Sequence, residues 1–201
     1  MPLENPRETP SQTAGPFVHI GTLPSLAGLS AYPAEIGASI AGPEVLGQRI
    51  AIEGCVFDGL GVPVGDMVIE VWQADPQGIY PHPADPRHAD AASGFTGFGR
   101  VATDFETGAF RIETVKPGPV PGRHGHVQSP HLSLWLVARG VNVGLHTRVY
   151  FGDDDTGADP LLGMVAPAFR RETLIATPAE DGVYRFDIHL QGDKETVFLD
   201  V

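Results

Sequence analysis

The chain has 201 residues, 42% of them hydrophobic, and a formal net charge of −12 at pH 7. This length and composition are typical of one globular core and exclude a disordered chain, and no apolar run reaches membrane-spanning length. With 25 acidic residues against 13 Lys and Arg, nucleic acid and anionic membrane surfaces are excluded as expected partners.

Cys55 is the only cysteine, so no intrachain disulfide is possible. It lies in the apolar run 50–57, which predicts a buried and inert thiol. The first residues lack the basic and apolar regions of a signal peptide. We therefore expect a cytoplasmic protein.

Residues 1–46 are rich in Pro and Gly and show little alternation, which predicts an extended N-terminal arm that packs on a partner chain. Within the arm, one short helical turn is expected near 34–40. The remainder, 47–201, is expected to form a β-sandwich core domain with little helix. Eight strands are predicted, over 49–57, 67–72, 97–103, 110–115, 132–138, 145–151, 184–190 and 196–199.

Strict alternation supports an all-β fold class. Phe110, Ile112 and Thr114 share one face of a strand and Arg111 and Glu113 the other, so one face is buried and the other is wet. The residues from 184 to 190 alternate in the same way. The segment 167–176 is the best helix candidate, although a loop with one helical turn fits it equally well.

Four stretches of sequence carry a family resemblance. They are TPSQTAGPF (9–17); EVWQADPQGIY (70–80) with GFGRVATDFETGAFRIETVKPGPVP (97–121); SPHLSLWLVARGVNVGLHTRVYF (129–151); and RRETLIA with YRFDIHLQGDKETVF near the end. In this order and spacing they resemble the intradiol aromatic-ring dioxygenases, and most of all the alpha chains of the protocatechuate-cleaving members. The resemblance spans most of the chain and implies an intradiol-dioxygenase-type β-sandwich.

Catalytic chains of this family hold non-haem Fe(III) with two tyrosinates and two histidines. The resemblance places these ligands at Tyr80, Val120, His131 and Ser133, so this chain retains only Tyr80 and His131. A ferric ion needs hard anionic ligands, and Val120 and Ser133 cannot replace a tyrosinate and an imidazole. We predict that this chain binds no metal and has no catalytic residue of its own.

A second ligand set is open, because His124, His126 and His131 lie close together in the run RHGHVQSPH. We give it little weight, since nothing in the sequence fixes this loop in the geometry that a metal requires. The remaining histidines have no companions at ligand spacing and are treated as ordinary surface or core residues: His19, His82, His88, His146 and His189.

The resemblance also implies substrate-pocket residues. Thr13, Gly15 and Pro16 match the alpha-chain residues that line the active-site cavity of a beta chain, and a Gly-Pro turn allows backbone to approach a ring closely. Arg139 matches an arginine near the same cavity, where its guanidinium would pair with the carboxylate of protocatechuate. Two plainer interpretations remain open, an arm that only anchors and a structural salt bridge at Arg139.

Arg100 and Arg148 lie within predicted strands and are expected to make ion pairs or interface contacts.

The activity that the resemblance implies is oxidative ring cleavage in aromatic catabolism, in the β-ketoadipate pathway. Protocatechuate and O2 would give 3-carboxy-cis,cis-muconate, with Fe(III) held by the beta chain and the two chains joined as αβ units of a larger oligomer. Two other functions stay open at this point. One is a self-sufficient catechol dioxygenase, which Val120 and Ser133 disfavour. The other is a transthyretin-like sandwich module that binds without chemistry.

Overall fold

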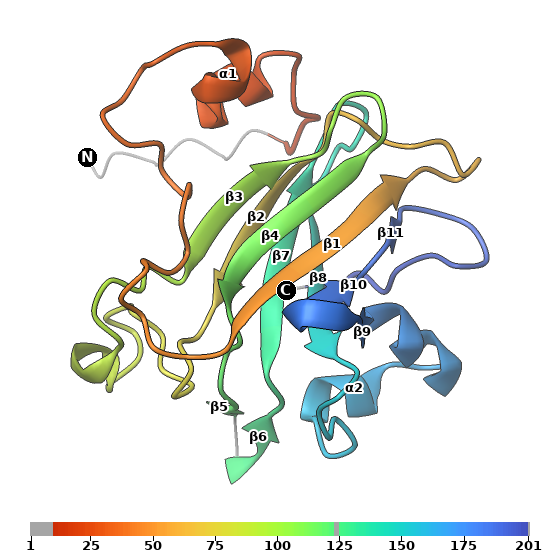
Figure 1. The fold of residues 1–201 in the computed structure, drawn as a ribbon. Helices are drawn as coiled ribbons and strands as arrows, with labels where there is room; N and C mark the ends of the chain where they lie inside the picture. Colours follow the sequence, from red (N-terminus) through yellow and green to blue (C-terminus); the bar gives the residue numbers. More distant parts are fainter. Residues whose placement is uncertain (1–9, 123–124, 201) are drawn as a thin grey trace, which may run out of the picture.

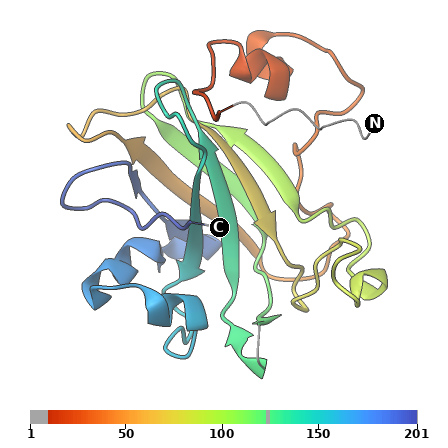
Figure 2. The ribbon, with the colours of Figure 1, turned by 180° about the vertical axis from the view of Figure 1, so that it is seen from behind.

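The computed structural model describes residues 10–122 and 125–200 of the chain. Its main element is a nine-stranded sheet with the order β4-β1-β10-β9-β8-β7-β2-β3, in which β11 also pairs with β1. The sheet curls so that β1 and β4 lie across from β2, β3 and β7 (Figures 1 and 2). This confirms the all-β class and the sandwich-like core. Among the helices of the described residues, none has the length and apolar character needed to cross a membrane.

The strands are β1 (Arg49–Phe57), β2 (Val68–Gln73), β3 (Phe98–Ala102), β4 (Ala109–Val115), β5 (Val120–Pro121), β6 (Val127–Gln128), β7 (His131–Val137), β8 (Leu145–Phe151), β9 (Ile175–Pro178), β10 (Val183–Arg185) and β11 (Ile188–His189). The helical segments are α1 (Val18–Thr22), η1 (Pro24–Ala27), η2 (His88–Asp90), α2 (Pro160–Met164), η4 (Ala168–Leu174) and η5 (Glu180–Gly182).

The core lies between the two halves of the curled sheet. Strand β4 shows how it forms, because Phe110, Ile112 and Thr114 are buried whereas Arg111 and Glu113 are exposed, as the alternation predicts. Ile112 stands opposite Ile52 of β1 in the antiparallel register, and both side chains are fully buried. Burying such aliphatic side chains contributes about 2 kcal/mol each to folding.

The predicted strand 184–190 is in fact two short strands, β10 and β11, both parallel to β1. Between them the carboxylate of Asp187 accepts a hydrogen bond from the backbone N–H of Cys55, at 2.9 Å, where a strand would use a carbonyl. Cys55 is half-buried, not buried as predicted. Partial burial and then Asp187 raise the pKa of its thiol, which keeps it protonated and unreactive.

Three further differences concern short segments. Residues 196–199 form no named strand, and Leu199 only bridges to His146. Strands β5, β6 and β9 were not predicted, because two to four residues show no periodicity. The helix candidate 167–176 is the 3₁₀ segment η4 followed by β9.

The N-terminal arm carries its helical turns at α1 and η1, and the described residues 34–40 form no helical turn, contrary to the prediction. That segment runs beside β3, because the N–H groups of Thr96 and Arg100 donate to the carbonyls of Ile40 and Gly37, both at 2.9 Å. Gly37 has φ +84°, a conformation that ends helices. In Figure 1 the helices α1 and η1 sit above one end of the sheet.

Candidate functional site

A cavity of about 590 Å³ lies at the end of the sheet where β7 begins. Tyr80, Trp72 and Val120 line it, together with Gln128 of β6. The Tyr80 and Trp72 rings stack with centroids 5.8 Å apart. Two of the four positions that the resemblance assigns to iron ligands, Tyr80 and Val120, thus meet at this cavity. Burial raises the pKa of Tyr80, so its phenol stays protonated.

His131, the third position, is the first residue of β7 and is buried. Its Nδ1 lies 2.8 Å from the carbonyl oxygen of Ser129, so Nδ1 carries the proton and donates it. Its Nε2 has no hydrogen-bond partner among the described residues. Burial, then the charge of Arg148, lowers the pKa of His131 to about 4. The imidazole is therefore neutral at pH 7.

Ser133, the fourth position, lies between Trp72 on β2 and Arg148 on β8 in the strand register. The guanidinium of Arg148 donates from Nη1 to the amide oxygen of Gln128, at 2.8 Å, and to the Tyr150 hydroxyl, at 3.2 Å. Among the described residues Arg148 makes no ion pair, so the interface contact expected as the alternative stays a prediction, whereas Arg100 pairs with Glu70 at 2.5 Å as expected. Arg148 thus places a positive charge beside two former ligand positions.

These residues do not fit a ferric ion. Val120 offers only an aliphatic group, Ser133 a weak hydroxyl, and the guanidinium of Arg148 opposes a trivalent cation. In the described part of the chain, no three His, Cys, Asp or Glu side chains are grouped to hold a metal. Of the alternative set, His124 lies outside the described residues, and His126 is exposed whereas His131 is buried.

The buried, neutral His131 predicts a stability that falls on acidification. Its pKa is about 4 in the folded chain and about 6.5 when unfolded, so the unfolded state binds the proton more readily below pH 6.5. The contribution of neutral His131 to the free energy of unfolding is complete above pH 6.5 and is lost as the pH falls toward 4. The loss amounts to about 2 kcal/mol between pH 7 and 5. His131→Gln, which cannot titrate, is expected to flatten this dependence of the unfolding midpoint. An unchanged slope in the variant would contradict the assignment.

A second cluster forms where the arm meets the far end of β7. The Thr13 hydroxyl donates to the carbonyl of Ala138, at 3.3 Å, and accepts from the N–H of Gly140, at 2.7 Å. Arg139 lies between those two residues, and its Nε donates to Asp66 Oδ2 at 2.5 Å. The structure therefore brings together Thr13 and Arg139, which the sequence placed in one pocket, although they are far apart along the chain.

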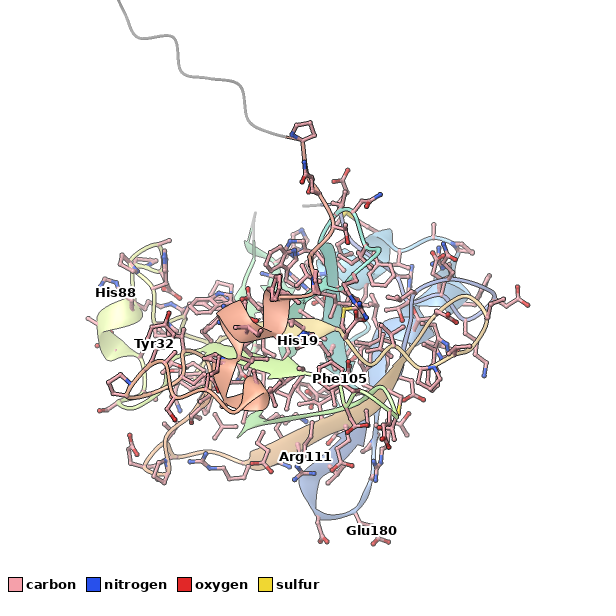
Figure 3. The ribbon with its side chains drawn as sticks, turned by 90° about the horizontal axis from the view of Figure 1, so that it is seen from above. His19, Tyr32, His88, Phe105, Arg111 and Glu180 are labelled. Carbon is pink, nitrogen blue, oxygen red and sulfur yellow. The ribbon has the colours of Figure 1, made fainter. Side chains whose placement is uncertain are left out.

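A cavity of about 320 Å³ completes this cluster, and Gly15, Pro16 and Arg139 line it with His19 and Asp66. His19 is buried on α1 and packs against Phe105, with ring centroids 5.2 Å apart (Figure 3). Burial lowers the pKa of His19. Sequence reasoning missed His19 and Asp66, because neither belongs to a spaced motif and only the fold brings them to Arg139.

The two cavities lie at opposite ends of one strand. His131 begins β7, and Arg139 follows two residues after its end. At about 3.3 Å per residue, the two positions are roughly 25 Å apart. The Arg139 cluster therefore cannot serve the cavity beside Tyr80 in the same chain.

Comparison with known proteins shows the family of the chain. Residues 34–192 match a family model described as "Dioxygenase". The chain is 46% identical to the protocatechuate 3,4-dioxygenase alpha chain of Pseudomonas putida, over 100% of both chains. It is 37% identical to the protocatechuate 3,4-dioxygenase beta chain of Burkholderia cepacia, over 76% of this chain and 68% of that one.

The fold agrees with these similarities. The structure of catechol 1,2-dioxygenase from Acinetobacter radioresistens superposes with a TM-score of 0.60 at 18% identity, covering 82% of this chain and 60% of that one. This likeness shows that the chain shares the fold of an intradiol dioxygenase. The chain belongs to the intradiol dioxygenase family, a family of non-haem iron enzymes, and groups there with the protocatechuate 3,4-dioxygenase alpha chains.

Proposed function

We propose that this chain is the iron-free alpha subunit of a protocatechuate 3,4-dioxygenase and that it completes an active site carried by a beta chain. The observation that supports this most is the separation of the two cavities. The residues matched to substrate contact, Thr13, Gly15, Pro16 and Arg139, lie roughly 25 Å from this chain's own remnant of an iron site. They are useful only if they face another chain's cavity.

The proposal assigns Fe(III) to the beta chain. Tyr80 and His131 are then remnants of a ligand set, and Val120 and Ser133 are its lost members. When bound there, the ferric centre supplies the activation of the catechol ring toward O2. Both oxygen atoms enter the product as the bond between the two hydroxyl-bearing carbons breaks, so protocatechuate and O2 give 3-carboxy-cis,cis-muconate with no other reactant.

This chain's share is binding and shape. The guanidinium of Arg139 would pair with the substrate carboxylate, which raises the local concentration of an anionic substrate against a chain of net charge −12. Gly15 and Pro16 line the same small cavity and offer backbone that can approach a ring closely. Together they would orient the ring and exclude water from it.

We further propose that residues 1–46 are an arm that packs on the beta chain, while 47–201 form the core domain. The described part of the arm exposes many large apolar side chains: Phe17, Ile20, Leu26, Leu29, Tyr32 and Ile36. A free monomer rarely shows so many on one segment, and a partner surface would cover them. The αβ units would assemble into a larger oligomer, and the cytoplasmic location expected from the sequence stays a prediction.

The alternatives receive less support. A self-sufficient catechol dioxygenase would need all four ligands, which Val120 and Ser133 do not supply. A binding module without chemistry would share the core pattern alone, whereas the similarity to the alpha chain of Pseudomonas putida extends over the whole length, arm included.

The test is to purify this chain alone and together with the related chain encoded beside it, and to measure iron content and protocatechuate cleavage. We expect iron and activity only in the joint preparation. A control with Tyr80→Phe in this chain should leave both unchanged, because Tyr80 would no longer be a ligand. One iron per lone chain with cleavage of catechols would overturn the proposal.

A further inference from the structure

The backbone on both sides of Arg139 is held by a single arm residue. Thr13 Oγ1 accepts from the N–H of Gly140 at 2.7 Å, and its one hydroxyl proton is shared between the carbonyls of Ala14, at 3.2 Å, and Ala138, at 3.3 Å. Ala138 is itself fully buried at the end of β7. The Cα of Arg139 is therefore fixed relative to both the arm and the sheet, and only its side chain remains to be placed.

Asp66 places that side chain. Its Oδ2 accepts from Nε of Arg139 at 2.5 Å, and no other polar contact of this guanidinium occurs among the described residues. The Asp66 side chain is 19% exposed and the Arg139 side chain 62% exposed, so the carboxylate lies inside and the guanidinium points outward. With Nε engaged, the edge formed by Nη1 and Nη2 is the one presented, and that edge binds a carboxylate through two parallel hydrogen bonds.

Asp66 is held in turn by a close backbone contact. A Cβ on Gly65 would lie 2.3 Å from the carbonyl oxygen of Phe105, so only glycine allows this approach. The ring of Phe105 packs against His19 of the arm. The turn that carries Asp66 is therefore packed against the turn of Phe105, which in turn contacts His19 of α1.

Charge alone does not explain a carboxylate site here. Among the residues that line the 320 Å³ cavity, the positive charge of Arg139 and the negative charge of Asp66 cancel. His19 is mainly neutral at pH 7, because burial lowers its pKa. Attraction must then come from the direction of the Nη groups and not from excess positive charge. The residue that sets this direction becomes important for selectivity.

We propose that Asp66 is a positioning residue that aims Arg139 at the carboxylate of the substrate, so that the enzyme discriminates protocatechuate from uncharged catechols. This inference rests on the proposed function, because it takes the substrate to lie in a beta-chain cavity beside the arm. Asp66 itself touches no substrate in this scheme. It acts only through the orientation of Arg139.

The experiment compares Asp66→Ala and Asp66→Asn in the co-purified complex. The readouts are KM and kcat for protocatechuate and the inhibition constant of 4-methylcatechol, which has a similar ring and no carboxylate. For Asp66→Ala we expect KM to rise about tenfold, with kcat and the 4-methylcatechol constant nearly unchanged. Asp66→Asn keeps an oxygen that accepts from Nε, so its KM should stay within about twofold of the unaltered complex.

Glu195→Ala is the matched control, since it removes the partner of another surface ion pair, with Arg170, and should change none of these values. Iron content and melting temperature establish that each variant is folded and assembled. Equal loss of affinity for both ligands, or no loss for either, would overturn the positioning role. If Arg139→Ala weakens the binding of protocatechuate more than that of 4-methylcatechol and Asp66→Ala does not, only the inference about Asp66 fails. If neither variant weakens protocatechuate selectively, the proposed contact between Arg139 and the substrate fails as well.

Discussion

Arg139→Met is expected to raise KM for protocatechuate roughly 10- to 100-fold in the assembled enzyme, because a charge-assisted hydrogen bond contributes about 1.5–3 kcal/mol. Methionine keeps an unbranched apolar side chain and removes the guanidinium. The value of kcat should change little, since the carboxylate lies away from the carbons that react and is bound equally in the ground and transition states. Steady-state kinetics at several salt concentrations would measure both, and the difference should shrink as salt screens the pair.

The matched control for this change is Arg185→Met. Arg185 is 63% exposed and pairs with Glu53 on β1, much as Arg139 is 62% exposed and pairs with Asp66. It lies on β10 and lines neither the 320 Å³ cavity beside Arg139 nor the cavity beside Tyr80. We expect its kinetics to match those of the unaltered enzyme. A similar rise in KM for both variants would mean that loss of any surface cation weakens substrate capture, and Arg139 would lose its special role.

Much of the fold could be predicted where a long run of residues has the composition or the apolar–polar alternation of a strand. The bounds of β1 and β8 agree with the predicted strands 49–57 and 145–151, because both are runs of seven to nine residues rich in aliphatic, aromatic and β-branched side chains. The division of the predicted strand 184–190 into β10 and β11 could not be predicted. The break between them depends on the hydrogen bond from Cys55 to Asp187, a residue 132 positions away. No local pattern carries that information.

In the arm, the sequence predicted the irregular backbone but not the position of its helical turns. Its composition predicted irregular chain, but the helical turn was expected near 34–40 and not at α1. The carbonyl of Gly37 accepts a hydrogen bond from Arg100 of β3, and this tertiary pairing outweighs a weak local preference for helix. Short helices depend on packing more than on sequence propensity.

The resemblance proposed some members of the candidate site but could not give its geometry. Thr13 and Arg139 were found by resemblance, yet the hydrogen bond from Gly140 to Thr13 joins residues 127 positions apart. Asp66 and His19 carry no motif, and only the approach of Gly65 to Phe105 and the packing of α1 bring them to the pocket. Arg148 was expected to make ion pairs or interface contacts, because its strand position says nothing about the former ligand positions beside it.

Asp75, the last residue of the WQAD run, is expected to be among the most important side chains for stability. Its carboxylate is fully buried and accepts from the backbone N–H groups of Gln77, Ile79 and Ala92, each at 2.9 Å. These bonds fix the turn that leads from β2 to Tyr80. Replacing Asp75 by alanine would remove the acceptor of all three N–H groups, of which that of Ile79 is buried and those of Gln77 and Ala92 are partly buried, at a cost of about 4 kcal/mol.

For a chain of this size, that cost should lower the midpoint of thermal unfolding by roughly 10 °C, measured by calorimetry on the co-purified complex. Asp104→Ala is the matched control, because Asp104 also accepts from two backbone N–H groups and a hydroxyl, those of Glu106 and Thr107, but on an exposed turn. Water can replace its oxygens there, so only a small shift is expected. Equal shifts in the two variants would mean that the turn itself, and not the burial of the carboxylate, sets the cost. A larger shift at Asp75 would show that this run is retained for structure, independently of any iron chemistry beside it.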